Sequence, residues 1–207
     1  MDIILAIILG ILFFPICILT ILAIKLESPA GPVFADTPKR VGKNGRPFYP
    51  YKFRSMIPNA VQYLKSHPDL YEKYKKGSFK LQDDPRVTQV GKFIRKYSID
   101  EVPQFINVLR GEMSLIGPRP YYPDEIEIQK QKYPHTKKLI DQALSVKPGI
   151  TGLWQVTGRS NINFDQRIDL DAHYAFVISN SFAKAIWYDL KILFQTPFAM
   201  LSAKGAV

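Results

Sequence analysis

The stretch IILAIILGILFFPICILTILAI, at residues 3–24, decides how this chain can fold, because it holds no charged side chain over a length that suits a bilayer. A secretory signal peptide would begin with a basic leader and end in small residues. This segment instead follows Met1 and Asp2 and runs directly into Lys25. We therefore interpret it as a membrane segment.

Pro15 leaves two membrane arrangements open. At a rise of about 1.5 Å per residue, the whole segment would just cross a hydrocarbon core of about 30 Å. A proline in mid-helix removes a backbone hydrogen bond and favours a kink or a break. The residues therefore permit a kinked spanning helix, which membranes tolerate, or a broken helix that enters one leaflet and turns back.

Composition limits what the rest of the chain can be. With 207 residues, 46% of them apolar and 22% charged, the chain is long enough for one globular core. Cys17 is the only cysteine, so no intramolecular disulfide can form. The three histidines stand far apart without the spacing of zinc ligands, at His67, His135 and His173.

The formal net charge of +10 indicates anionic partners. Basic residues cluster just after the apolar segment, at Lys25, Lys39, Arg40, Lys43 and Arg46. The positive-inside rule places the following domain on the cytoplasmic side, and each such residue near anionic head groups contributes about 1 kcal/mol. A solvated basic face is the alternative interpretation, whereas no nucleic-acid-binding motif is present.

Residues 33–55 predict a short β-hairpin. Asn44 and Gly45 form the dipeptide that favours a tight turn between two strands. Three prolines confine these strands to a sheet edge, namely Pro38, Pro47 and Pro50. Residues 58–76 then read as polar amphipathic helix interrupted at His67 and Pro68, and a short basic segment covers residues 87–96.

The stretch YSIDEVPQ, at residues 97–104, predicts the start of a helix that Gly111 ends. Ser98 with Glu101 fits a capping box, or Asp100 is itself the cap. The two arrangements exclude each other. We favour Asp100 at or next to the cap, because a Ser98 cap would move Pro103 past the first turn, where proline costs a hydrogen bond.

Helix capping is the ordinary explanation of the acidic pair Asp100 and Glu101, and a chemical one stands beside it. A helix start attracts phosphate and lowers the pKa of a carboxyl group there. An ionised carboxylate beside a phosphate is a potential nucleophile where cations neutralise the repulsion. Cations flank the pair at Lys92, Arg95, Lys96 and Arg119.

Two further features bear on this chemistry. Arg119 lies in GPRP, where two prolines would stiffen the loop, and arginine suits bidentate phosphate contact. A second acidic pair, Asp83 and Asp84, is followed by Pro85, which indicates a solvated turn. The pair at residues 100 and 101 is therefore the better candidate for a reactive or metal-binding site.

Taken in order, these segments resemble the bacterial sugar transferases, the monotopic phosphoglycosyl transferases. The resemblance covers nearly the whole chain. It is carried by the proline-centred apolar segment and by GPVF, KRVGKNGRPF, YKFRSM, DDPRVTQVGKFIRKYSIDEVPQFINVLRGEMSLIGPRP, KPGITGLWQVTGR and DLKILFQT.

The resemblance implies a reaction. Such enzymes transfer a sugar 1-phosphate from a UDP-sugar to polyprenyl (undecaprenyl) phosphate, release UMP, and start polysaccharide assembly. Asp100 would attack the phosphorus and form a phosphosugar ester, which polyprenyl phosphate then displaces. Asp100 and Glu101 would hold Mg²⁺, and Glu101 would assist the acceptor phosphate. Members with a similar helical insert hand over hexose phosphates such as galactose or glucose, but no residue here names the sugar, the pathway or an oligomeric state.

The motif match also implies binding residues. Arg119 would grip the diphosphate or uridine, with Pro118 and Pro120 fixing its loop. Arg95 and Lys52 would contact phosphate. The remaining candidates for donor binding are Arg54, Thr151, Gly152, Gln155 and Arg159. For Lys52, Arg54 and Gln155 the alternative is a surface charge or a turn hydrogen bond.

The implied fold is α+β and mostly helical. A re-entrant helix broken at Pro15 would anchor residues 1–26 in one leaflet of the bacterial inner membrane. Residues 27–207 would form the catalytic domain on the cytoplasmic face, with a short β-hairpin and interfacial amphipathic helices. Residues 182–201 would supply aromatic side chains to that interface or to the core. The chain departs from the family in having Phe14 before the proline and no basic pair ahead of Asp2.

Two alternatives to this function are distinguishable. A basic, membrane-anchored module that binds anionic lipid or nucleic acid without catalysis would explain the charge and the apolar segment. It would leave the acidic pair and GPRP unexplained. A spanning transferase with a different mechanism would place its N-terminus on the outer face of the membrane.

Overall fold

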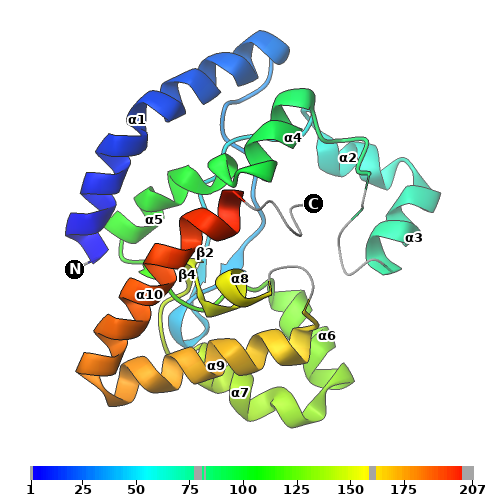
Figure 1. Ribbon diagram of the computed structural model, residues 1–207. Coiled ribbons are helices and arrows are strands. Elements are labelled where there is room, and N and C mark those ends of the chain that lie inside the picture. The colour runs from blue at the N-terminus through cyan, green and yellow to red at the C-terminus, as the bar shows by residue number, and fades with distance from the viewer. Residues whose placement is uncertain (1, 77–80, 82, 159–161, 202–207) are drawn as a thin grey trace.

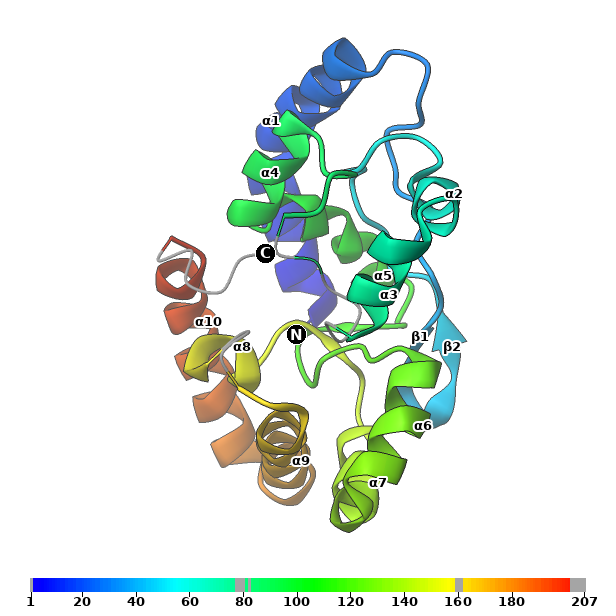
Figure 2. The same ribbon diagram turned by 90° about the vertical axis from the view of Figure 1, so that its right-hand side faces the viewer.

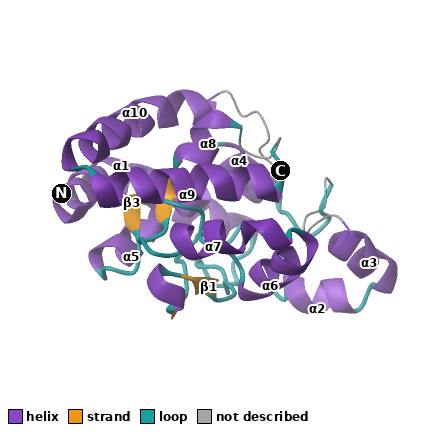
Figure 3. Cartoon of the chain, turned by 90° about the horizontal axis from the view of Figure 1, so that it is seen from below, coloured by secondary structure: helices purple, strands orange, loops and turns teal. Residues whose placement is uncertain are grey.

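The computed structural model describes residues 2–76, 81, 83–158 and 162–201. It is mostly helical with two short sheets, which confirms the predicted α+β class (Figures 1 and 3). The strands are β1 (Arg40–Val41), β2 (Pro47–Phe48), β3 (Ser114–Ile116) and β4 (Gly149–Thr151). The α-helices are α1 (Asp2–Glu27), α2 (Ala60–Lys65), α3 (Pro68–Lys76), α4 (Gln89–Lys96), α5 (Phe105–Leu109), α6 (Pro123–Lys132), α7 (Lys137–Ala143), α8 (Leu153–Thr157), α9 (Phe164–Asn180) and α10 (Phe182–Leu201). Three 3₁₀ turns join them, η1 (Lys43–Gly45), η2 (Ile99–Gln104) and η3 (Pro134–Thr136).

The apolar segment forms one continuous helix, α1, with Pro15 inside it. The expected break at Pro15 is thus absent from its secondary structure, although the ribbon changes direction along its length (Figure 1). By length and composition α1 is able to cross a membrane, and only 11% of its most apolar window is buried against the protein. Its arrangement as a re-entrant helix stays a prediction.

Both ends of α1 are bonded to the domain that follows it. At the start, the Ser114 hydroxyl donates to a carboxylate oxygen of Asp2 at 2.8 Å. At the end, Glu27 accepts the backbone N–H groups of Gln89 and Val90, at 2.8 and 3.2 Å, at the first turn of α4. The helix therefore lies along the domain, packed against α5 and α4 (Figure 2).

An apolar cluster attaches α1 to the segments that carry the acidic pair. Its buried centre consists of three residues: Ile24 of α1, Ile94 of α4, and Phe53 of the loop between β2 and α2. Ile99 of η2 packs against them. Phe53 follows Lys52 and Ile99 precedes Asp100. The cluster thus fixes both neighbouring residues relative to α1.

The predicted hairpin is confirmed at β1 and β2, which pair antiparallel with Arg40 opposite Phe48. Its turn places Asn44 and Gly45 at φ angles of 54° and 79°. Those positive angles are the reason for the Asn-Gly dipeptide, since most other residues are strained there. The predicted helices over residues 58–76 and their interruption near His67 are confirmed as α2 and α3.

A parallel pair of three-residue strands, β3 and β4, has no counterpart in the expectations from sequence. Its ladder continues past the strands, because Gly117 N–H donates to the Thr151 carbonyl and Gly149 N–H to the Pro118 carbonyl, each at 2.9 Å. A Cβ atom on Gly149 would lie 2.1 Å from the Gly117 nitrogen. Only glycine therefore allows this approach.

The pair lies within a core cluster that includes Val108, Met113, Leu115, Tyr174 and Ile192. A second core joins α6, α7 and α9 at the opposite end of the molecule from α4 (Figures 1 and 2). The site described below lies where segments from both ends meet.

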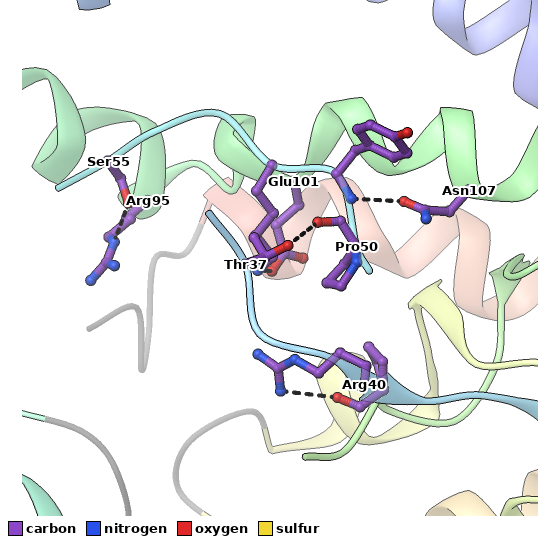
Figure 4. A network of polar contacts seen from close by, with 10 residues as sticks. Thr37, Arg40, Pro50, Ser55, Arg95, Glu101 and Asn107 are labelled. Atoms are coloured by element: carbon purple, nitrogen blue, oxygen red, sulfur yellow. Dashed lines mark hydrogen bonds and ion pairs between the residues drawn. The ribbon is translucent and has the colours of Figure 1, made fainter. Parts of the chain in front are cut away.

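We predict that Asn107→Ala destabilises the fold. Asn107 is fully buried and accepts from the Tyr51 N–H at 2.9 Å (Figure 4). It also donates to the Tyr49 carbonyl at 2.8 Å, and the two bonds hold the segment beside Lys52. Truncation leaves these buried backbone groups unpaired, at a cost of about 2 kcal/mol, so thermal unfolding in detergent should shift down by about 4–8 °C.

The matched control is Asn180→Ala, because Asn180 is exposed and its amide bonds only the local carbonyl of Phe176 among the hydrogen bonds of the described residues. Its unfolding midpoint should stay within about 1–2 °C of the unmodified chain. Equal shifts in the two variants would contradict the role given to Asn107.

Candidate active site

The acidic pair lies in the 3₁₀ turn η2, and neither of the two expected caps forms. Ser98 precedes the turn with a positive φ of 55°, and its side chain makes no capping hydrogen bond. Asp100 is the second residue of the turn rather than its cap. Pro103 has no N–H, so the Asp100 carbonyl is free to accept the Phe53 N–H at 2.9 Å. The expected α-helix begins only at Phe105 and ends before Gly111, whose φ is 76°.

The two carboxylates have different surroundings. Asp100 is 8% exposed, and burial raises its pKa to about 6, with Lys52 and Arg95 opposing that rise and Glu101 adding to it. For Glu101, burial acts to raise the pKa, but Lys52, Arg119 and Arg40 together outweigh burial and the net pKa is lowered. Asp100 is therefore mostly ionised near neutral pH yet weakly solvated, which suits a nucleophile.

Two cations flank the pair. The Lys52 ammonium donates to Glu101 Oε1 at 2.5 Å, and both side chains are about a quarter exposed (24% and 28%). Arg95, in the last turn of α4, donates from Nε to the Ser55 hydroxyl at 2.8 Å, which orients its guanidinium (Figure 4). Segments distant in the sequence thus converge on residues 100 and 101.

A cavity of about 80 Å³ opens beside Glu101. Of the residues predicted for the site, Lys52, Glu101, Arg119, Pro120 and Gln155 line it, which brings YKFRSM, the acidic pair, GPRP and GLWQ together. The other lining residues are Arg40, Pro50, Gln104, Gly149, Ile150 and Trp154.

The other predicted residues that the structure describes lie outside the cavity lining, namely Arg54, Arg95, Asp100, Pro118, Thr151 and Gly152. Pro118 and Gly152 shape the backbone, since the Pro118 carbonyl accepts the Gly149 N–H and a Cβ on Gly152 would lie 2.2 Å from the Gly117 oxygen. The Thr151 hydroxyl bonds that of Thr196 at 2.8 Å. The buried Arg54 guanidinium donates to Ser28, after α1, at 3.1 and 3.3 Å. Arg159 lies outside the described residues.

Three arginine planes near the cavity lie over aromatic rings, an arrangement that the sequence did not indicate. Arg119 and Arg167 stand 5.1 and 5.5 Å from the ring centre of Trp154, and Arg40 lies 3.2 Å from that of Tyr122. The buried Nε atoms of these arginines have no hydrogen-bond partner among the described residues. The site thus offers three buried Nε donors without a protein acceptor among the described residues.

Asp171 is a further residue that sequence reasoning missed. It is 1% exposed and accepts the Tyr121 hydroxyl at 2.7 Å and the Arg119 backbone N–H at 3.1 Å. It thereby holds the GPRP loop from α9. Its spacing from Ile168, Ala172 and Ala175, all buried on α9, is the signal that would have found it, since an Asp on an apolar helix face needs a partner.

The second acidic pair is not the solvated turn that Pro85 suggested. Asp83 is exposed, but Asp84 accepts two hydrogen bonds from the Arg86 guanidinium, at 2.8 and 2.6 Å, in a nearly buried pair. Asp84 therefore has a structural partner.

The acidic pair at residues 100 and 101 fits a magnesium ion only in part. Over the described residues, no cluster of three or more His, Cys, Asp or Glu side chains is able to hold a metal. Mg²⁺ is commonly held by one or two carboxylates together with phosphate oxygens and water. Asp100 and Glu101 supply such a pair, although Lys52 already occupies one Glu101 oxygen. Magnesium binding stays a prediction.

The sequence that forms this fold and cavity matches a known class of protein. The pattern of the family described as bacterial sugar transferase matches residues 1–203. The chain is therefore a member of that family.

Particular relatives are similar over most of the chain. It is 47% identical over 88% of its length to "Galactosyl transferase CpsE" of Streptococcus agalactiae. It is 42% identical over 88% to "Undecaprenyl-phosphate galactose phosphotransferase" of Salmonella typhimurium, and 37% identical over 99% to "UDP-glucose:undecaprenyl-phosphate glucose-1-phosphate transferase" of Escherichia coli. The chain spans 37%, 36% and 40% of the lengths of these three proteins.

We predict that Tyr121→Phe destabilises the GPRP loop. The change leaves the buried Asp171 carboxylate with the Arg119 N–H but without the hydroxyl donor, at a cost of about 1–2 kcal/mol. Thermal unfolding in detergent would report it as a lower midpoint. The control is Tyr49→Phe, since Tyr49 is 56% exposed and keeps its ring, and an equal loss in that variant would contradict the assignment.

Proposed function

We propose that this protein transfers a sugar 1-phosphate from a UDP-sugar to polyprenyl phosphate, releases UMP, and thereby starts the assembly of a polysaccharide. One observation carries the proposal: Lys52, Glu101 and Arg119 line one cavity, and the residue before Glu101 is a buried carboxylate, Asp100, outside the cavity lining. Family membership and the names of the relatives support the same reaction class.

The chemistry proceeds in two displacements at one phosphorus atom. In the first, an Asp100 oxygen attacks the phosphorus that carries the sugar, the bond to the bridging oxygen breaks, and UMP leaves with that electron pair. In the second, an oxygen of polyprenyl phosphate attacks the same phosphorus and the bond to Asp100 breaks. The carboxylate is regenerated, and the sugar leaves on a polyprenyl diphosphate.

The surrounding residues have definite tasks in this scheme. Burial keeps the Asp100 carboxylate poorly solvated, while Lys52 and Arg95 keep it ionised and offset the charge of the incoming phosphate. Arg119 binds on the nucleotide side of the cavity, where Gln155 also lies. Glu101, with Asp100, would hold Mg²⁺, which would neutralise charge on the phosphate oxygens.

The N-terminal helix supports a one-leaflet membrane arrangement. A helix of 26 residues is about 39 Å long and, by itself, could cross a bilayer. Its two ends, however, are hydrogen-bonded to one domain through Asp2 and Glu27. On α10 an exposed apolar stripe continues the membrane-facing surface, comprising Trp187, Leu190, Phe194 and Phe198. We propose that both lie at the cytoplasmic face of the membrane, where the enzyme meets a soluble donor and a lipid acceptor.

We predict that Asp100→Asn abolishes turnover, with UMP release falling by about 10³-fold or more, because an amide is not a nucleophile. Purified protein in detergent or nanodiscs would be given a panel of UDP-sugars with polyprenyl phosphate. Incubation with donor alone should add the mass of one phosphosugar to the unmodified chain at residue 100. The variant should gain none.

The matched control is Asp83→Asn, an identical change in an exposed turn outside the cavity. It should keep full turnover. An adduct on another residue, or unchanged turnover in a folded Asp100→Asn protein, would rule out the nucleophile assignment.

We predict that both ends of α1 face the cytoplasm. Single cysteines at Ile3 and Ala30, each exposed, would be introduced in a Cys17→Ala background. A membrane-impermeant maleimide should label both positions in inverted vesicles and neither in intact cells whose outer membrane is permeabilised. Labelling of the two positions from opposite sides would establish a spanning helix and contradict the one-leaflet arrangement.

A further inference from the structure

Arg40 is a buried cation at the cavity that no expectation from sequence placed there as a binding residue. It begins strand β1, is 8% exposed and lines the cavity together with Lys52, Glu101 and Arg119. One Nη donates to the Pro120 carbonyl at 3.2 Å (Figure 4). The guanidinium carbon lies over the Tyr122 ring, 3.2 Å from its centre. Its Nε atom is buried with no partner among the described residues.

The carboxylates near Arg40 are committed to other cations. Glu101 accepts from Lys52, and Glu125 lies 3.7 Å from Arg167. Within the described part of the chain, no ion pair includes Arg40. Burial accordingly lowers the pKa of Arg40 to about 10. A buried guanidinium without a counter-ion lowers the free energy of unfolding. We therefore expect an anionic ligand to bind beside Arg40 and to act as its counter-ion.

Arg86 shows what a structural buried arginine looks like in the same protein. It is 4% exposed and, like Arg40, lies over a tyrosine ring, that of Tyr74, at 5.2 Å. Unlike Arg40, it donates two hydrogen bonds to the carboxylate of Asp84. The two arginines differ in whether the protein supplies the anion.

The cationic side chains of the site form two groups, one at the cavity and one outside its lining. Arg40, Arg119 and Lys52 line the cavity together with Glu101, whereas Asp100 and Arg95 lie outside its lining. Arg40 and Arg119 therefore lie on the Glu101 side of the pair, away from the nucleophile. A diphosphate laid across the site has its attacked phosphorus by Asp100 and its other phosphate by these arginines.

We infer that Arg40, together with Arg119, binds the nucleotide-side phosphate of the donor, the phosphate that leaves with UMP. The inference rests on the proposed function. The Nε edge of a guanidinium suits two oxygens of one phosphate, and stacking on Tyr122 fixes the plane of that fork. When the bridging bond breaks, the electron pair moves onto this phosphate, so the same contacts stabilise the leaving group.

The experiment compares Arg40→Met with Arg86→Met in the full chain, in nanodiscs. UDP binding is measured by calorimetry, unfolding is measured thermally without ligand, and kcat/KM is measured separately for the UDP-sugar and for polyprenyl phosphate. Arg40→Met should weaken UDP binding and lower the donor kcat/KM by about 30-fold or more, without lowering the unfolding midpoint. Arg86→Met should lower the midpoint and leave UDP affinity unchanged.

The readouts separate this inference from the function on which it rests. If the unmodified protein binds neither UDP nor inorganic pyrophosphate, the proposed function itself fails. If it binds UDP and Arg40→Met binds equally well, only the assignment of Arg40 is overturned. Loss of the fold in Arg40→Met would also overturn it, because that result indicates a structural cation.

Two further arms address the source of the phosphate and the shape of the cation. A fall confined to the kcat/KM of polyprenyl phosphate would assign Arg40 to the acceptor and overturn the donor assignment. Arg40→Lys keeps the charge but not the planar fork, so its UDP affinity should lie between those of the unmodified and Met proteins. Affinity equal to that of the unmodified protein would contradict bidentate binding.

Discussion

The close pairing of strands β3 and β4 is the constraint on which the site depends. Two glycines, Gly117 and Gly149, let the backbones approach so closely that a Cβ atom on Gly149 would collide with its neighbour. Parallel strands release their following loops at the same edge, so GPRP and GLWQ leave side by side. Arg119 on one loop and Gln155 on the other consequently face one cavity. Without this pairing the cavity would lose the wall opposite Lys52 and Glu101.

The cavity is lined by more cationic than anionic side chains. Three arginines, Arg40, Arg119 and Arg167, have buried Nε atoms without a partner in the described chain, and aromatic rings cover their planes. Stacking on a ring contributes about 0.5–2 kcal/mol and leaves the N–H edges unsatisfied. The aromatic rings therefore hold the cations in position without neutralising them. On the proposed function, an anionic substrate would supply the missing acceptors, so the free energy lost to the fold by burying these cations would be recovered when the substrate binds.

The sequence predicted those features that short-range backbone preferences determine, such as turns and helix ends. Asn44 and Gly45 specify the hairpin because they accept positive φ angles, and Pro68 separates α2 from α3. The pairing of β3 with β4 could not be predicted from the sequence. Each strand has only three residues, too few to show the alternation of apolar and polar residues that indicates a strand, and two helices separate them. The caps were wrong for a related reason: the carbonyl that Pro103 leaves free is taken by Phe53, a distant residue. The role of Arg40 depends on burial by elements that its own neighbours in sequence do not reveal.

The N-terminal helix also packs against the segments that carry the acidic pair and Lys52. Ile99, beside Asp100, and Phe53, beside Lys52, both pack in the cluster that contains Ile24 of α1. Asp100, the proposed nucleophile, and Lys52 are thus each one residue from a side chain that packs against the apolar helix. If α1 lies at a set depth in one leaflet, the fold sets the depth of the nucleophile as well. A phosphate carried by a membrane lipid is confined to the head-group layer. On the proposed function, the packing of η2 against α1 would therefore bring the two reacting groups to one level without lifting the lipid out of the bilayer.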